Sequence, residues 1–281
     1  MTGWLNGLIA IGLLLSIFYS GLDTGVSFGT LLEPKNVRAV QRFIADLWPM
    51  ETSPPFLWQI LKLLWETVEI SLVSTALAIV FALPLSVVAI RPQGEEFDVR
   101  RLGKLQWSLR WLVYYFVRAL LGLLRGIPEL MWALIFVVAV GLGPFPGILA
   151  LAAHSTGILG KLYGEMFETV DLRFVETARV SGCNQFQEFL FVRFPMSLSI
   201  FLSYTLFRWE CNLRSATVLG FVGAGGIGTQ LIISMKLFMY HEVSTLIFAI
   251  LLLVIAIELL GQFLRVRVLR SDTGKGIREG R

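Results

Sequence analysis

The chain has 281 residues, of which 56% are hydrophobic and only 16% are charged. Soluble domains carry about 25% charged residues, so this composition excludes an ordinary soluble protein and predicts a polytopic membrane protein. The net charge of +4 does not indicate a nucleic-acid binder, because the basic residues cluster in short runs that flank apolar segments.

Six apolar segments are long enough to cross a bilayer. The predicted spans are residues 4–22, 65–90, 109–140, 148–167, 195–219 and 243–264. No basic residue precedes the first segment and no small-residue cleavage site follows it, so we expect a retained helix or a signal anchor rather than a cleaved signal peptide. The fold class predicted is therefore all-α, with about six transmembrane helices.

Between the first two spans, residues 23–57 are polar and rich in proline. Their apolar residues fall at helical spacing, which predicts a short amphipathic helix on the outer surface, with a plain loop helix as the alternative. These residues are Val37, Val40, Ile44 and Leu47.

Two of the predicted spans contain helix breakers. Pro84 should kink the second span, which is tolerated where neighbouring helices cover the freed carbonyl. The third span is too long for one upright helix, and Gly126, Ile127 and Pro128 interrupt it, so a bent or tilted helix is expected.

Basic residues predict the orientation. If the C-terminus is inside, the inner segments carry most of them and the outer ones carry few, which supports six spans with both ends in the cytoplasm. The inner set before the tail is Arg91, Arg100, Arg101, Lys104, Arg110, Arg173, Arg179 and Arg193, and the outer set is Lys35, Arg38, Arg42 and Lys236. Residues 170–195 would then face the cytoplasm.

This inner segment carries a spaced motif. It contains Glu176, Thr177 and Ala178, then Gly182, and later Val192, Phe194 and Pro195. A polar helix between spans can lie on the membrane surface and fit a groove on another protein. Gly182 permits a sharp turn between two short helices, and Pro195 is suited to start the next helix. An ordinary amphipathic loop is the alternative.

The spacing resembles the EAA loop of ATP-binding-cassette import permeases, with Thr177 in place of the second alanine and Phe194 in place of leucine. Residues 125–130 resemble a segment of the third core helix of these permeases, and residues 209–220 and 222–228 are similar to the phosphonate-type group. The resemblance covers roughly residues 60–265. It implies a type I importer fold, a homodimer of this chain, two cytoplasmic ATPase subunits and a periplasmic binding protein.

Together with this resemblance, the sequence suggests that the chain has three parts. Residues 1–57 form an N-terminal helix and outer segment, 58–266 the permease core with its coupling loop, and 267–281 a basic cytoplasmic tail. The resemblance also implies which residues couple this chain to the ATPase: Glu176, Thr177, Ala178, Gly182, Val192 and Pro195.

Charged residues inside the spans point to a solute path, because each costs about 2.5–3.5 kcal/mol to insert. Arg125 and Glu129 are spaced for an intrahelical ion pair, as are Glu210 and Arg214, whereas Arg118 and Arg208 have no obvious local partner. By spacing, Arg118 shares a helix face with Arg125 and Glu129.

We hypothesise that arginines line a path for an anion, since a guanidinium pairs phosphonate or phosphate oxygens bidentately. In this hypothesis Glu129 and Glu210 hold the arginines in place, and purely structural pairing is the alternative. The candidate path residues are Arg125, Pro128, Glu129, Arg208, Glu210, Asn212 and Arg214.

Gly223, Gly225, Gly226 and Gly228 also match a dinucleotide-binding spacing. A dinucleotide site needs a strand before the glycines inside a βαβ unit, and an apolar helix precedes them here, so that interpretation is rejected. Two interpretations remain: an outer glycine-rich turn that packs closely, or one that exposes N–H groups to a passing anion. In the fourth span, Gly157, Gly160 and Gly164 predict close helix packing.

Catalytic and metal signatures are missing from the sequence. It lacks a phosphate-binding G-x-x-x-x-G-K-[ST] motif, so ATP and Mg²⁺ are expected in a partner ATPase and no cofactor or metal on this chain. Its two histidines, His154 and His241, are far apart, and His154 is expected to be a hydrogen-bonding residue inside the bundle. Cys183 and Cys211 are not expected to form a disulfide.

Taken together, the sequence predicts a non-enzymatic permease subunit in a bacterial inner membrane, importing phosphonate, phosphite or a related oxyanion. The alternatives are a permease for another small solute such as methionine and, further off, a secondary carrier or channel. A membrane enzyme acting on a phosphorylated lipid would need a nucleophile or base beside the arginines, and none is found.

Overall fold

The computed structural model describes the backbone of residues 2–24, 29, 32–91 and 95–276. Side chains are described within these ranges except at residues 2, 3, 22, 95–103 and 268–276. Across the described residues all regular structure is helical, which confirms the predicted all-α class. The chain divides into two units, Met1–Pro49 and Met50–Arg281.

The first unit consists of two helices. Helix α1, Thr2–Asp23, is apolar and exposed along its described length, as a membrane span would be. Helix α3, Pro34–Asp46, starts with a proline in its first turn, where the missing N–H is not needed. Its bounds confirm the helix predicted from the spacing of Val37, Val40 and Ile44.

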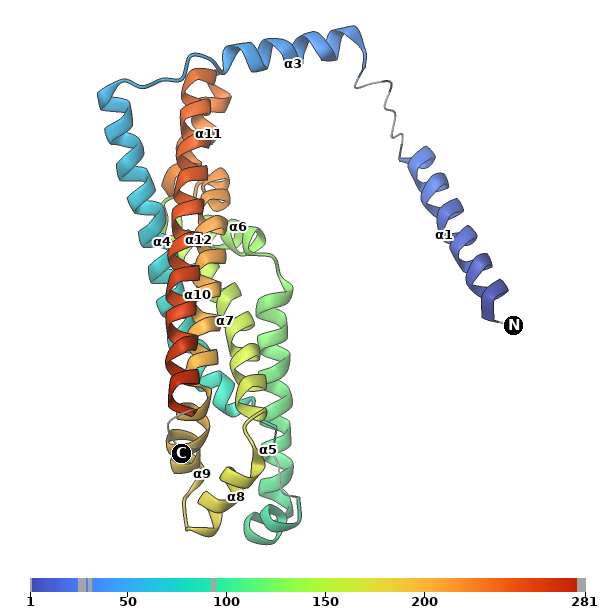
Figure 1. The fold of residues 1–281 in the computed structure, drawn as a ribbon, viewed down its shortest axis with the longest axis vertical. Helices are drawn as coiled ribbons and strands as arrows, with labels where there is room; N and C mark the ends of the chain where they lie inside the picture. Colours follow the sequence, from blue (N-terminus) through green and yellow to red (C-terminus); the bar gives the residue numbers. More distant parts are fainter. Residues whose placement is uncertain (1, 25–28, 30–31, 92–94, 277–281) are drawn as a thin grey trace. The chain divides into compact units, whose positions relative to one another are not determined.

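The second unit is a helical bundle (Figure 1). Its elements are α4 (Pro54–Val88), α5 (Glu95–Gly126), α6 (Glu129–Val140), α7 (Pro144–Glu168), α8 (Leu172–Val180), α9 (Gln185–Glu188), a π-helical turn (Phe189–Arg193), α10 (Phe194–Leu219), a 3-10 turn (Gly220–Val222), α11 (Gly226–Lys236) and α12 (Tyr240–Gly276).

Helix α7 lies at the centre of this bundle and packs against α4, α5, α6 and α10. Small residues allow the close approach. A Cβ added to Gly157 would lie 2.5 Å from the backbone N of Arg125, and one on Gly160 would lie 2.5 Å from a methyl group of Leu121. The predicted small-residue packing of this span is thus confirmed at these two glycines.

Length and hydropathy give fewer spans than the six predicted. Four described helical stretches qualify, and the α5–α6 pair raises the number to five. Helix α7 does not qualify, because glycine, serine, threonine and histidine dilute its apolar residues. Those residues face other helices rather than lipid, so burial in the bundle replaces the hydropathy that an exposed span needs.

The third predicted span is bent, which confirms the first of the two predicted alternatives. Helices α5 and α6 meet at Ile127–Pro128 with a bend of 88°. Arg125 lies near the end of α5 while Glu129 starts α6, so the prediction of one shared face is wrong for Glu129. Arg118 and Arg125 remain on one helix and line the same cavity. Pro84 lies inside α4, so the chain stays helical across the predicted kink site. Helix α4 begins already at Pro54, because proline is favoured in a first helical turn.

Helix ends from distant parts of the sequence meet at one end of this unit. Figure 1 shows α8, α9, the beginning of α5 and the end of α12 at the same end of the bundle. Helix α12 continues to Gly276, so the first part of the predicted tail is helical. The motif at residues 176–195 and the C-terminal end of α12 thus lie on one side of the bundle.

Candidate functional site

The motif at residues 176–195 folds into two short helices joined by a turn. Asp171 caps α8 by accepting a hydrogen bond from the N–H of Arg173, and Asn184 forms a capping box with Gln187 at the start of α9. Gly182 lies between them with φ +88°, a conformation that other residues avoid. The turn predicted at Gly182 is confirmed.

Pro195 lies at the start of the next helix, as predicted. It lies in the first turn of α10, but α10 follows without a break from a π-helical turn. Proline has no N–H for an ordinary helical bond and its ring crowds the carbonyl four residues earlier, whereas the N–H of Phe194 reaches back to the carbonyl of Phe189. The wider π-helical turn thus precedes α10 directly and accommodates the proline in the first turn of α10.

The outer face of α8 and α9 is open. Glu176 and Thr177 are exposed, while Val175 packs inward at 1% exposure. Two apolar side chains of the same segment also face outward, with Val180 89% and Phe186 70% exposed. A charged helix carrying exposed apolar groups is suited to bind another protein.

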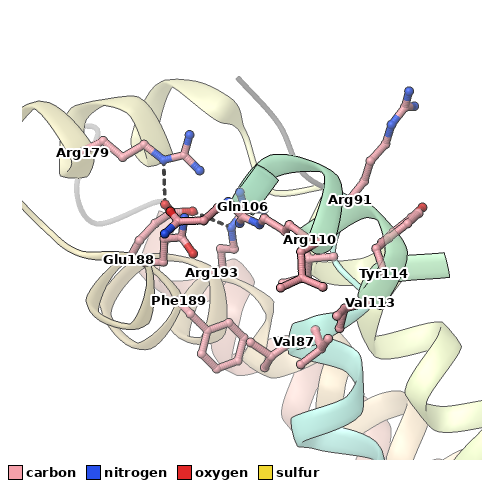
Figure 2. Close-up of a pocket in the computed structure, with 14 residues that line it drawn as sticks. Val87, Arg91, Gln106, Arg110, Val113, Tyr114, Arg179, Glu188, Phe189 and Arg193 are labelled. Atoms are coloured by element: carbon pink, nitrogen blue, oxygen red, sulfur yellow. Dashed lines mark hydrogen bonds and ion pairs between the residues drawn. The ribbon is translucent and has the colours of Figure 1, made fainter. Parts of the chain in front are cut away.

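A buried ion cluster fixes this segment to the bundle (Figure 2). Arg179 and Arg193 converge on Glu188, donating from Nε to its two carboxylate oxygens at 2.7 and 2.9 Å. Arg193 also donates from Nη1 to the carbonyl of Phe167 at 2.6 Å, at the end of α7. Because α8, the π-helical turn and α7 share one network, the exposed face is held rigidly on the central helix.

A second polar network crosses the bundle where α4, α7 and α10 meet. Ser155 Oγ donates to Asn212 Oδ1 at 2.8 Å, and Asn212 Nδ2 donates to Thr75 Oγ1 at 2.8 Å. Arg208 joins through a bond from Nε to Ser155 Oγ at 2.9 Å. Its Nη2 is buried and has no hydrogen-bond partner among the described residues. Asn212 and Arg208, two of the candidate path residues, thus both bond to Ser155.

The carboxylates of the predicted path have other partners than those expected. Glu129 accepts a hydrogen bond from Ser215 Oγ at 2.8 Å and lies 3.3 Å from His154 Nε2, so its expected pair with Arg125 is wrong. The bend between α5 and α6 removes the helical register that such a pair requires. His154 is buried and its Nδ1 lies 2.9 Å from the carbonyl of Ile127, which confirms its predicted role.

Glu210 likewise does not pair with Arg214. It accepts two hydrogen bonds from Arg265 of α12, at 2.8 and 3.0 Å. Arg214 is exposed, and its Nη2 lies 3.9 Å from Cys211 Sγ. Glu210 pairs with Arg265 across helices rather than with Arg214 of its own helix, because the packing of α12 on α10 encloses the Glu210 carboxylate and leaves Arg214 exposed.

Arg118 also has a partner that spacing could not show. Its Nη2 donates to Glu168 Oε1 at 2.7 Å. It lines a 220 Å³ cavity together with Arg125, Gly122 and Lys161. Arg125 therefore lines a different cavity from Arg214, and the structure does not gather all the candidate path residues around one cavity.

The glycine-rich turn packs closely. Gly223, Gly225 and Gly226 all have positive φ, and a Cβ on Gly228 would collide with the carbonyl of Thr217. The N–H of Gly226 donates to Glu66 Oε1 at 3.0 Å, and that of Ile227 to Thr67 Oγ1 at 3.0 Å. These amides are occupied by α4, so close packing is the interpretation that the geometry favours.

Several important residues had escaped the sequence analysis. Glu188 and Glu66 were not singled out, and neither was the row of hydroxyl residues in α4 that includes Ser71 and Thr75. One signal was present, since serine and threonine inside apolar spans commonly bond between helices. Glu188 offered no comparable signal, because its two partners are set by the fold of the loop.

Comparison with known proteins decides the family. Residues 104–271 match the family described as binding-protein-dependent transport system inner membrane component. The chain belongs to this family. It is a permease component and a multi-pass protein of the inner membrane.

The permease resembles transporters of several solutes. It is 35% identical to the phosphite transport system permease protein PtxC of Stutzerimonas stutzeri, over 90% of this chain and 84% of that protein. It is 31% identical to the phosphate-import permease protein PhnE of Mycolicibacterium smegmatis, over 76% of this chain and 38% of that one. The solved MetNI methionine transporter shares the fold, with a TM-score of 0.62 at 20% identity, over 77% of this chain and 99% of its own.

Proposed function

We propose that this permease imports phosphite, phosphonate or a related phosphorus oxyanion, as two copies of the chain with two cytoplasmic ATPase subunits and a periplasmic binding protein. ATP and Mg²⁺ are bound by the ATPase subunits and no cofactor by this chain. The observation that carries the coupling role is the rigidly held, outward-facing pair α8–α9. A phosphorus oxyanion is supported by the names of its relatives, whereas the methionine transporter supports the fold alone.

Both termini are proposed to lie in the cytoplasm. The C-terminal end of α12 lies at the same end of the bundle as α8 and α9, and this end carries the larger share of basic residues. An ATPase docked on α8–α9 would then stand on the side where ATP is available.

The coupling proposal is tested by cross-linking. With Cys183 and Cys211 replaced by serine, a cysteine is introduced at Phe186 or, as a control, at Leu237 beyond the end of α11. We expect the first variant alone to cross-link to the ATPase subunit, and the yield to change with ATP. Equal yields from both positions would overturn the docking surface.

For the solute path, we propose a 310 Å³ cavity between α6 and α10 lined by Pro128, Glu129, Arg214 and Ser215 among others. Arg214 is the exposed cation of this cavity, and a guanidinium can pair two oxyanion oxygens at once. Arg208 and Asn212 belong to the neighbouring polar network, in which both bond to Ser155. Arg125 and Glu210 belong to other surroundings and serve the path only by supporting helices.

Replacing Arg214 tests this path. In proteoliposomes with the partner subunits, Arg214→Gln should abolish ATP-driven phosphite uptake and leave complex assembly intact, while Arg214→Lys keeps part of it. Arg267→Gln, which removes an exposed charge outside the cavity, is the control. Unchanged uptake by Arg214→Gln would rule out a role for this residue.

A further inference from the structure

One cavity of the permease lies apart from the proposed solute path. It has a volume of about 450 Å³ and lies where the end of α4 and the first half of α5 meet α8–α9 and the π-helical turn (Figure 2). This volume falls in the range of ligand sites, about 300–1,000 Å³. A free phosphorus oxyanion is only a few times the size of a water molecule, which occupies about 30 Å³ in the liquid, so it would fill only part of this cavity.

The lining of this cavity has two chemical halves. One half is apolar and includes Val87, Leu109 and Phe189. The other half is cationic and includes Arg91, Arg179 and Arg193, and among the described lining residues Glu188 supplies the one carboxylate. We call the apolar half the floor of the cavity and the cationic half its rim. Such a lining fits a molecule that carries both a hydrocarbon part and an anionic group.

Two arginines of the cationic half are held in place before any ligand binds. Arg179 and Arg193 are fixed on Glu188 through their Nε atoms. The N–H of Arg91 donates to Glu168 Oε1 at 2.7 Å, which anchors the chain just after α4. The fixed guanidinium groups of Arg179 and Arg193 lose little entropy when an anion arrives, and the exposed side chain of Arg91 adds a third positive charge at the edge of the cavity.

We infer that this cavity binds the phosphate group of an anionic phospholipid, with the acyl chain against the apolar floor. Basic pockets between helices on the cytoplasmic side of membrane proteins bind anionic lipid headgroups. The assignment of this end to the inner leaflet rests on the orientation proposed above. A soluble phosphorus oxyanion shares the phosphate chemistry but would leave the apolar half unused.

A bound lipid would touch the coupling segment directly, because Glu188 and Phe189 form part of the wall. The lipid would therefore brace the junction between the bundle and α8–α9, and transport would depend on anionic lipid even though the solute never enters this cavity.

The test uses the purified full-length permease and native mass spectrometry to count retained lipids. We expect phosphatidylglycerol to be retained over phosphatidylcholine. Arg91→Gln should weaken phosphatidylglycerol binding about fivefold, the effect of one basic residue near the surface, and Arg91→Lys should restore most of it. Arg267→Gln, an exposed charge near the end of α12, should bind like the original chain.

Each other outcome is decisive. Equal losses from Arg91→Gln and Arg267→Gln, or no preference for phosphatidylglycerol, would overturn the site. Displacement of the lipid by millimolar inorganic phosphate would overturn the lipid as ligand and assign the rim to a soluble oxyanion. Because the measurement needs no ATPase, binding protein or transported solute, failure of the proposed import function would leave its result unchanged.

Discussion

The carboxylate of Glu188 accepts a hydrogen bond from Nε of Arg193 at 2.9 Å, and both side chains are enclosed, at 4% and 3% exposed. This pair joins the π-helical turn to α7, since the same arginine reaches the carbonyl of Phe167. It makes the coupling segment part of the bundle core, although α8 and α9 are short helices that could not stand alone.

Glu188→Gln is expected to destabilise this junction strongly. Removing one partner of a buried ion pair leaves an uncompensated charge and costs about 3–5 kcal/mol. Thermal unfolding in detergent should show the loss. The matched control is Glu165→Gln, because Glu165 forms a half-exposed pair with Lys161, worth about 0.5 kcal/mol or less. Similar losses in both variants would contradict the buried cluster.

Gly182→Ala should strain the turn between α8 and α9. A non-glycine residue at φ +88° costs about 1–2 kcal/mol, and no atom of the described residues lies within 4 Å of the added Cβ, so backbone strain is the expected effect. ATP-driven uptake should fall while the bundle stays folded. Gly122→Ala, equally uncrowded but inside α5, should be neutral or stabilising. Full activity of Gly182→Ala would show that the turn tolerates change.

The packing of α7 predicts that an added methyl group destabilises the permease at Gly157 but is tolerated at Gly164 of the same helix. Gly157→Ala would place a Cβ 2.5 Å from the backbone of Arg125, and overpacking of this kind costs about 1–3 kcal/mol. Gly164→Ala meets its nearest neighbour, Ser86, at 3.5 Å, an ordinary contact. The fraction of folded permease after heating should separate the two. Equal stability would mean that α5 and α7 are less close.

A double-mutant cycle tells the two possible partners of Glu210 apart. For Glu210 and Arg265, in contact at 2.8 Å, we expect a coupling free energy of about 0.5–3 kcal/mol. For Glu210 and Arg214 it should be near zero. The measurement is the free energy of unfolding of the single and double glutamine variants. Coupling to Arg214 instead would favour the intrahelical pair.

The sequence predicted those features that depend on a residue's own type and its neighbours along the chain. The turn at Gly182, the break at Ile127–Pro128 and the close packing of Gly157 follow from residue type and position alone. Ion pairs were not readable in this way. Spacing suggested Glu129 with Arg125 and Glu210 with Arg214, and both assignments failed.

The sequence by itself determined that this chain is a helical membrane protein with a spaced loop motif, because hydropathy and breakers act locally on the backbone. Only the tertiary structure decided which charges meet. Inside a low-dielectric bundle each charge needs a partner, and helices α7 and α12 bring Glu168, His154 and Arg265 from far along the chain to supply them. Contacts at such sequence distances depend on packing, which no local pattern encodes.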